Sequence, residues 1–220
     1  MKKPLKRRKQ NKPARIALLV ATGNAHKLRE IRKILGARYR CFGQDILAAA
    51  PRVKETGKTF RANAKLKALG FRAAWLRADD APRVDWILAD DSGLVVRALR
   101  GAPGVRSARY AGRGATDEKN RAKLLREMRK RRDRRARFEC VLALLAARGG
   151  RVHFFRGVAE GDLALKEKGS GGFGYDPLFM PRGTSRTFAE MSALAKNRLS
   201  HRGAALRELA RWSESTRIAR

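Results

Sequence analysis

Four chemically different side chains stand close together near the end of the chain. Between residues 192 and 202 the sequence holds Lys196, Ser200, His201 and Arg202, which supply an ammonium, a hydroxyl, an imidazole and a guanidinium group. Lys196 and Ser200 share one face if this segment is a continuous helix, because residues four apart are neighbours on a helix surface. Imidazole and guanidinium N–H groups can donate to O6 and N7 of a purine. The cluster therefore favours a 6-keto base over adenine.

Two adjacent carboxylates, Asp90 and Asp91, stand directly before Ser92 and Gly93 and follow the apolar run of residues 86–89. The run predicts a buried strand that ends at the pair. Adjacent strand residues point to opposite faces, so we expect one carboxylate to bind Mg²⁺ and the other to brace the loop or hold a metal-bound water. An ordinary polar turn is the alternative, because Asp, Ser and Gly are common in turns.

A short loop joins the apolar run of residues 16–20, which predicts a strand, to a helical pattern that ends near Gly36. The loop consists of Thr22, Gly23, Asn24, Ala25, His26 and Lys27. Backbone N–H groups at the start of a helix bind phosphate, and Lys27 adds a positive charge there. A turn with Asn24 as the helix N-cap and no ligand is the alternative, and we expect the His26 ring to be solvated.

Four glycines surround two aromatic residues in residues 169–177, the segment that contains Phe173, Gly174, Tyr175 and Asp176. A flexible backbone that presents a ring suggests a platform for stacking a base. Alternatively, the two rings only fix a long loop to the core.

The remaining pattern predicts helices over residues 59–76, 116–130 and 200–212, and neighbouring strands over residues 138–147 and 152–158. The last two strands are joined too closely to be parallel, so the sequence predicts an α/β fold with a mixed sheet flanked by helices. We expect residues 1–14 to be a disordered basic tail, residues 15–212 a single domain and residues 213–220 a C-terminal tail.

The chain has 220 residues, of which 43% are hydrophobic, and no apolar run approaches the roughly 20 residues of a membrane span. The basic N-terminus has no apolar core of a secretory signal, so we expect a soluble, cytoplasmic protein with no membrane partner. Cys41 and Cys140 lack metal-type spacing and are expected to be buried thiols.

The formal net charge is +33, with dense basic runs at residues 2–12 and 126–137. Contact with nucleic acid, electrostatic capture of a nucleotide, and a compositional bias towards arginine are three explanations. Nucleic acid is a possible partner of this surface but not an expected one, because no interleaved aromatic motif accompanies either run.

Taken together, residues 22–27, 90–93 and 192–202 resemble the inosine triphosphate pyrophosphatase family, the XTP/dITP diphosphatases. Further matches follow in family order between Ile16 and about Leu209, at residues 55–60, 63–68, 99–110 and 187–191. The resemblance implies an elongated fold with two lobes and the active site in the cleft between them, a homodimer, and Mg²⁺ as cofactor. It also implies hydrolysis of dITP, ITP and XTP to the monophosphate and pyrophosphate, through attack of water on the α-phosphorus.

The same resemblance implies a role for each matching residue. Asp91 would be the general base and a metal ligand, with Glu55 as a further metal ligand. Residues 22–27 and Lys67 would hold the triphosphate, and Ser92 would contact the substrate. The residues expected to orient the base are Phe173, Gly174, Tyr175, Asp176, Lys196, His201 and Arg202.

Two departures from the family pattern concern the metal. Lys54 stands where the family commonly has an acidic residue, and Ala62 replaces the glutamate of a Glu-Asn-Ala block. Two alternatives therefore remain: a related pyrophosphatase for modified pyrimidine or methylated nucleotides, and a nucleic-acid-binding protein on an inactivated hydrolase scaffold.

Overall fold

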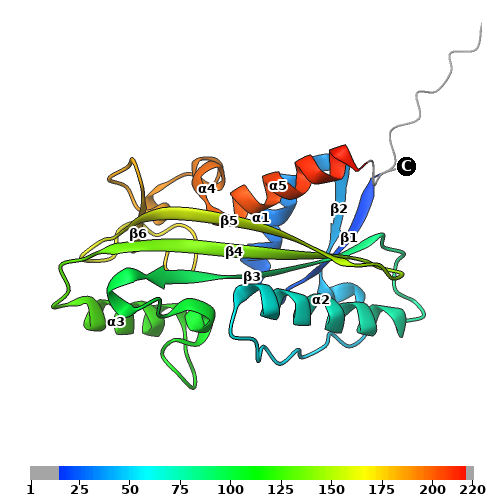
Figure 1. The fold of residues 1–220 in the computed structure, drawn as a ribbon, viewed down its shortest axis with the longest axis horizontal. Coiled ribbons are helices and arrows are strands. Elements are labelled where there is room, and N and C mark those ends of the chain that lie inside the picture. Colours follow the sequence, from blue (N-terminus) through cyan, green and yellow to red (C-terminus); the bar gives the residue numbers. More distant parts are fainter. Residues whose placement is uncertain (1–14, 217–220) are drawn as a thin grey trace, which may run out of the picture.

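The computed structural model describes residues 15–216, which form an elongated α/β molecule built on one six-stranded sheet (Figure 1). The strands are β1 (Ile16–Ala21), β2 (Tyr39–Phe42), β3 (Trp86–Val96), β4 (Arg135–Ala146), β5 (Val152–Leu163) and β6 (Phe179–Pro181). The helices are α1 (Ala25–Leu35), α2 (Phe60–Leu76), α3 (Asp117–Met128), α4 (Ala193–Leu199) and α5 (His201–Ser215). The predicted tail at residues 1–14 lies outside the described residues.

The sheet is mixed, as the sequence predicts, in the order β2-β1-β3-β4-β5-β6. Strand β1 is parallel to both β2 and β3, whereas β3, β4, β5 and β6 pair in antiparallel fashion. Figure 1 shows α1 and α5 on one face of the sheet and α2 and α3 on the other. Three apolar clusters fill these layers: one under α1 and α5, one under α2, and one at the far end beneath α3.

Strand β3 is much longer than the apolar run of residues 86–89, and this corrects one prediction. The carboxylates of Asp90 and Asp91 lie in the middle of the strand rather than at its end, because β4 continues to pair with β3 as far as Val96. The polar-turn alternative is therefore wrong. Strand β1, in contrast, ends at Ala21 opposite Ala89, so the loop that follows β1 lies beside the carboxylate pair.

Local capping signals place the helix starts correctly. The Asn24 side chain accepts hydrogen bonds from the backbone N–H groups of His26 and Lys27, which fixes the first turn of α1. Thr59 caps α2 and Thr116 caps α3 through equivalent side-chain bonds. Helix α3 ends at Met128, two residues before the predicted end.

The C-terminal segment is not one continuous helix. Ser200 has extended backbone angles (φ −74°, ψ 151°), closes α4 and caps α5 by accepting from the Gly203 N–H at 3.0 Å. The expectation that Lys196 and Ser200 share one helical face is therefore wrong, because the cap turns the chain between them. Helix α5 continues to Ser215, beyond the predicted boundary at residue 212.

Both cysteines are free thiols, but only Cys140 is buried, whereas Cys41 is half-buried.

No helix within residues 15–216 combines the length and apolar character that a membrane span requires.

Candidate functional site

The candidate site lies where β1 ends, α1 begins and β3 passes beside them. Asp90 and Asp91 project from opposite faces of β3, as expected for adjacent strand residues, and their surroundings differ. Asp90 faces α1 and α5, whereas Asp91 faces Lys67 on α2. The two carboxylates therefore belong to different networks, which we call the Asp90 network and the Asp91 side.

The Asp90 network is buried, and both carboxylate oxygens of Asp90 accept hydrogen bonds. Lys27 and the Ser92 hydroxyl donate to Oδ1, the latter at 3.0 Å, while Arg202 Nε (2.9 Å) and the Cys140 thiol (3.1 Å) donate to Oδ2. Burial opposes ionisation of Asp90, but the charges of Arg202 and Lys27 outweigh it and hold the pKa of Asp90 well below its usual range. Asp90 is therefore a permanent anion that fixes two cations.

Glu30 joins this network and was missed in the sequence. Its carboxylate accepts from Arg202 and from Lys196 Nζ (2.6 Å), and Lys196 also donates to Asp176 at 2.6 Å. Burial raises the pKa of Glu30, yet Arg202 and Lys196 lower it below the usual value. Its position three residues after Lys27 on α1 was the available signal, because residues three apart share a helical face.

The Asp91 side is only partly satisfied. Lys67 Nζ donates to Asp91 Oδ1 at 2.9 Å and lies 3.6 Å from Glu55 Oε1. The other oxygen, Oδ2, is buried and has no hydrogen-bond partner among the described residues. Burial raises the pKa of Asp91, and the Lys67 charge offsets this only in part. One buried carboxylate oxygen is thus free for a ligand.

A cavity of about 310 Å³ is lined by Lys67, the lysine that Asp91 holds. Most of the predicted phosphate contacts line it, namely Thr22, Gly23, Asn24, Lys27 and Lys67, together with the predicted metal ligand Glu55. We call it the phosphate cavity. Ala25 and His26 do not line it. The His26 ring is exposed, as expected, with Nδ1 2.9 Å from Arg29 Nη2 and its centroid 5.2 Å from that of Phe173.

A second cavity, of about 110 Å³, lies on the other side of Lys27, and Asn24 and Lys27 line both cavities. We call it the base cavity, because its walls contain all the predicted base contacts: Phe173, Gly174, Tyr175, Asp176, Lys196, His201 and Arg202. Ser92 also lines it. The structure thus brings together residues that are up to 178 positions apart in the chain, from Asn24 before α1 to Arg202 at the start of α5.

His201 and Arg202 enter the base cavity in different states. The His201 ring stacks on Phe138 with centroids 4.6 Å apart, and its Nδ1 has no partner. Burial, reinforced by Arg202, lowers the pKa of His201 well below its usual value, so the imidazole is neutral. Arg202 is 1% exposed and donates to Asp90, Glu30 and Ser92. Much of its donor capacity is therefore already used within the protein.

The two aromatic rings of the glycine-rich loop also differ. Tyr175 is buried and its hydroxyl donates to the Ser107 carbonyl at 2.9 Å, so this ring anchors the loop. Phe173 is half-buried, with Lys196 Nζ 4.7 Å and the Arg202 guanidinium 5.7 Å from its ring centroid. Gly172 has φ +77°, and a Cβ there would collide with the Asp176 carboxylate. Only glycine fits at this turn.

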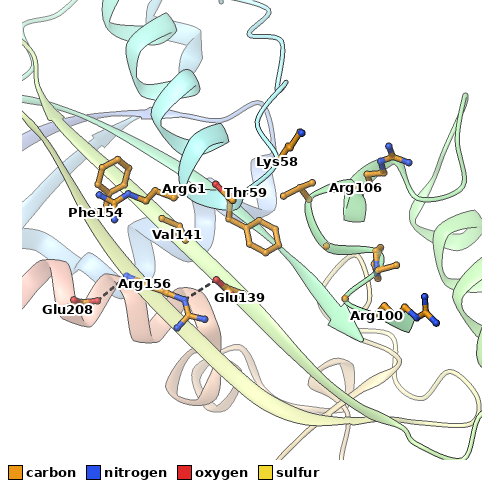
Figure 2. A pocket seen from close by; sticks show the side chains of 16 residues that line it. Lys58, Thr59, Arg61, Arg100, Arg106, Glu139, Val141, Phe154, Arg156 and Glu208 are labelled. Carbon is orange, nitrogen blue, oxygen red and sulfur yellow. Dashed lines mark hydrogen bonds and ion pairs between the residues drawn. The ribbon is translucent and has the colours of Figure 1, made fainter. Parts of the chain in front are cut away.

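A larger cavity of about 630 Å³ contains none of the predicted site residues (Figure 2). It lies between the start of α2, the segment around Arg106, and strands β4 and β5, where Arg156 Nε donates to Glu139 at 2.9 Å. The cavity of greater volume is therefore separate from the carboxylate pair.

The donor set at Asp91 constrains what metal could bind. Among residues 15–216 no three Cys, His, Asp or Glu side chains converge as a metal cluster. The two candidate ligands, Asp91 and Glu55, flank Lys67 instead. Mg²⁺ commonly uses one or two protein carboxylates together with substrate phosphates and waters. The orphaned Asp91 Oδ2 and the neighbouring phosphate cavity fit that pattern.

The fold and the site define an α/β protein whose mixed sheet carries a phosphate cavity and a base cavity around a central carboxylate pair. The family model described as the Ham1 family matches residues 18–212. The chain belongs to this family.

Individual relatives agree over nearly their whole length. A protein of Geobacter sulfurreducens named dITP/XTP pyrophosphatase is 46% identical, covering 86% of this chain and 92% of the relative. One of the same name from Christiangramia forsetii is 42% identical over 87% of this chain and 96% of the relative. The solved structure of the Staphylococcus aureus Ham1 protein, 36% identical, superposes with a TM-score of 0.78 over 91% of this chain and 99% of that one.

Proposed function

We propose that this protein hydrolyses deaminated purine nucleoside triphosphates, dITP, ITP and XTP, to the monophosphate and pyrophosphate. The observation that carries the proposal is the junction of the two cavities: Asn24 and Lys27 line both, Asp90 holds Lys27, and Asp91 holds Lys67 in the wall of the phosphate cavity. A nucleotide that spans the junction would place its base against His201 and its phosphates at the start of α1. The relatives named dITP/XTP pyrophosphatase support the same assignment.

In this arrangement the triphosphate binds at the N-terminus of α1 and between two lysines. Backbone N–H groups of a first helical turn attract phosphate. Lys67 faces the phosphate cavity while it is held by Asp91, and Lys27 faces it while it is held by Asp90. The two carboxylates therefore orient the cations before the substrate arrives, which reduces the entropic cost of binding.

Magnesium would be held by Asp91 and Glu55, together with phosphate oxygens. When bound, Mg²⁺ would neutralise phosphate charge and polarise the scissile phosphoryl group. Lys54 replaces an acidic residue of the family pattern, but its side chain is exposed, so solvent and salt weaken its repulsion of a cation. Ala62 contributes no ligand, which leaves Glu55 as the second carboxylate on this side.

Asp91 is the best-placed base in the site. A water would attack the α-phosphorus as the bond between the α-phosphorus and the bridging oxygen breaks, so that pyrophosphate leaves with the bond electrons. The water proton would pass to the Asp91 carboxylate, whose raised pKa makes it a stronger base than an exposed aspartate. This route needs no covalent enzyme intermediate.

The base cavity favours a 6-keto purine through matched polarity. A neutral imidazole at His201 has one N–H to donate, and the Lys196 and Arg202 cations lie close to the Phe173 ring. A 6-keto oxygen accepts from such donors, whereas the 6-amino group of adenine would leave a buried donor unpaired. Mismatches of this kind can lower kcat/KM by about 10⁴.

We also propose, from the family resemblance, that the protein acts as a homodimer.

The test is to incubate the purified protein with Mg²⁺ and each of dITP, XTP, dGTP, dATP and a methylated or modified pyrimidine triphosphate. Monophosphate and pyrophosphate from dITP and XTP, with dATP largely spared, are the expected products by chromatography. Preferred turnover of the pyrimidine or methylated substrates would contradict the substrate class. No turnover of any nucleotide, combined with tight and salt-dependent nucleic-acid binding, would favour an inactivated scaffold instead.

A further inference from the structure

We propose that Asp117 and Arg121 of α3 are positioning residues for base recognition, because they hold the Gly174 peptide unit from both sides and so fix the loop that presents Phe173. The inference rests on the proposed function of the base cavity. It concerns a helix that the sequence motifs left without a role.

The two contacts on Gly174 are direct and complementary. The Gly174 N–H donates to Asp117 Oδ2 at 2.7 Å, and Arg121 Nη1 donates to the Gly174 carbonyl at 3.0 Å. Asp117 is the first residue of α3 and Arg121 lies four residues later, so both project from one face of the helix. We call this pair of contacts the α3 clamp. A charged partner on each side makes both hydrogen bonds stronger than ordinary neutral ones.

Arg121 also connects the segment before the glycine-rich loop with the second half of that loop. Its Nε lies 3.0 Å from Glu167 Oε2, before the loop, while its Nη1 binds Gly174, near the loop's end. The Arg121 side chain is only 11% exposed. A half-buried arginine with two anchors restricts the loop far more than a solvated side chain would.

Side-chain packing does not fix the position of Gly174. The residue has no side chain, has φ +64°, and a Cβ built there would meet no atom within 4 Å. Its position therefore depends on its two backbone hydrogen bonds. Gly169 and Gly172 on the same loop have φ +77°, so the preceding chain is conformationally permissive as well.

Phe173 is held from the opposite direction by the base cavity. Its N–H donates to Asp176 Oδ2 at 2.8 Å, and the same oxygen accepts from Lys196 at 2.6 Å. The Phe173–Gly174 segment is thus fixed between α3 on one side and α4 on the other. Without the α3 clamp only one side of this segment would remain fixed, and the ring would lose its fixed distance to the base.

The clamp is tested with Asp117→Ala and Arg121→Ala against two matched controls on the same helix. Glu118→Ala removes the neighbouring first-turn carboxylate, whose side chain is 75% exposed and whose ion pair with Arg121 Nη2, at 3.8 Å, contributes little because solvent screens it. Arg126→Ala removes an exposed arginine. Each clamp variant should raise KM for dITP by about tenfold, the equivalent of one lost charge-assisted hydrogen bond. Because Asp91 is untouched, kcat should stay within about twofold. The preference for dITP over dATP should fall, and both controls should match the wild type.

Two further readouts separate positioning from mere stabilisation of α3. Asp117→Asn keeps an acceptor oxygen and should restore most of the KM, whereas a purely electrostatic effect on the helix start would not be restored. Backbone amide hydrogen exchange over residues 169–176 should quicken in the clamp variants, without nucleotide and at unchanged global stability.

The proposal would be overturned if amide exchange over residues 169–176 and the KM for dITP were both unchanged in the two clamp variants. It would also be overturned if the control variants changed these quantities as much as the clamp variants do. Failure of the proposed function has a different signature: the wild type would not turn over dITP at all. In that case the exchange rates of residues 169–176 alone decide whether the clamp exists.

Discussion

Asp90 and Asp91 are neighbours in sequence, share one strand and have opposite properties. The Asp90 network gives each oxygen of its carboxylate two donors and lowers its pKa. The Asp91 side leaves one buried oxygen without a partner and raises the pKa. Desolvation acts on both groups, so the difference comes from the cations that tertiary packing places against each face of β3.

One dipeptide thus supplies both a rigid ion-pair network and a reactive carboxylate. A saturated carboxylate such as Asp90 holds its cations in place but has no capacity left for chemistry. An unsaturated one such as Asp91 can accept a metal ion or a proton. Native proteins rarely leave a buried oxygen unpaired without a functional reason, and here the other oxygen of the same carboxylate holds Lys67, which lines the phosphate cavity.

Asp91→Asn tests the difference between the two carboxylates most directly. The change should lower kcat for dITP by about 10²–10⁴, because the base and a metal ligand are lost together. The free energy of unfolding should stay within about 1 kcal/mol of the wild type, because the amide removes a buried charge that the site does not fully compensate. Steady-state kinetics and urea denaturation measure the two quantities. Near-normal turnover would remove Asp91 from its role.

Asp90→Asn should show the reverse pattern. Removing this charge leaves Arg202 and Lys27 buried beside a neutral amide, which should cost about 3–5 kcal/mol of unfolding free energy. Urea denaturation measures the loss, with Asp79→Asn, an exposed aspartate, as the control. A loss no larger than that of the control would show that the network contributes little to stability.

The smallest expected effect concerns His201. Its folded-state pKa is lowered from 6.5, so below about pH 6.5 the unfolded chain binds a proton that the folded chain does not. The wild type should therefore lose stability as pH falls through this range, by up to about 1.4 kcal/mol per pH unit relative to His201→Gln. Denaturation midpoints of both proteins between pH 5 and 7.5 give the difference. Parallel curves would mean that the folded imidazole accepts a proton and is not neutral.

Much of the fold was predictable because its signals are local. Asn24 and Thr116 mark helix starts through hydrogen bonds to residues two or three positions away, and the close spacing of β4 and β5 leaves only an antiparallel pairing. Many of the residues that line the two cavities were also predictable, through the motifs that resemble the family. These features depend on neighbouring residues or on a pattern preserved in order along the chain.

Other features could not be predicted, because they depend on partners far away in the chain. The length of β3 is set by its pairing with β4 about 50 residues later, which placed Asp90 in mid-strand rather than in a turn. Glu30 gave no strong signal on an exposed-looking helix, yet its partners Lys196 and Arg202 lie more than 160 residues away. The break at Ser200 is a local cap that the continuous helical spacing obscured.

The sequence by itself determined the types of most elements, the starts of the main helices and many of the chemically capable residues, since propensity, capping and spacing act over a few residues. Only the tertiary structure decided which aspartate has all its carboxylate oxygens hydrogen-bonded and which has one without a partner. It also decided that Tyr175 anchors the loop while Phe173 borders the base cavity, and that α3 forms hydrogen bonds with Gly174. Those distinctions arise from burial and from charges brought together by folding. A carboxylate or an imidazole has no fixed chemistry until its dielectric surroundings and its partners are set.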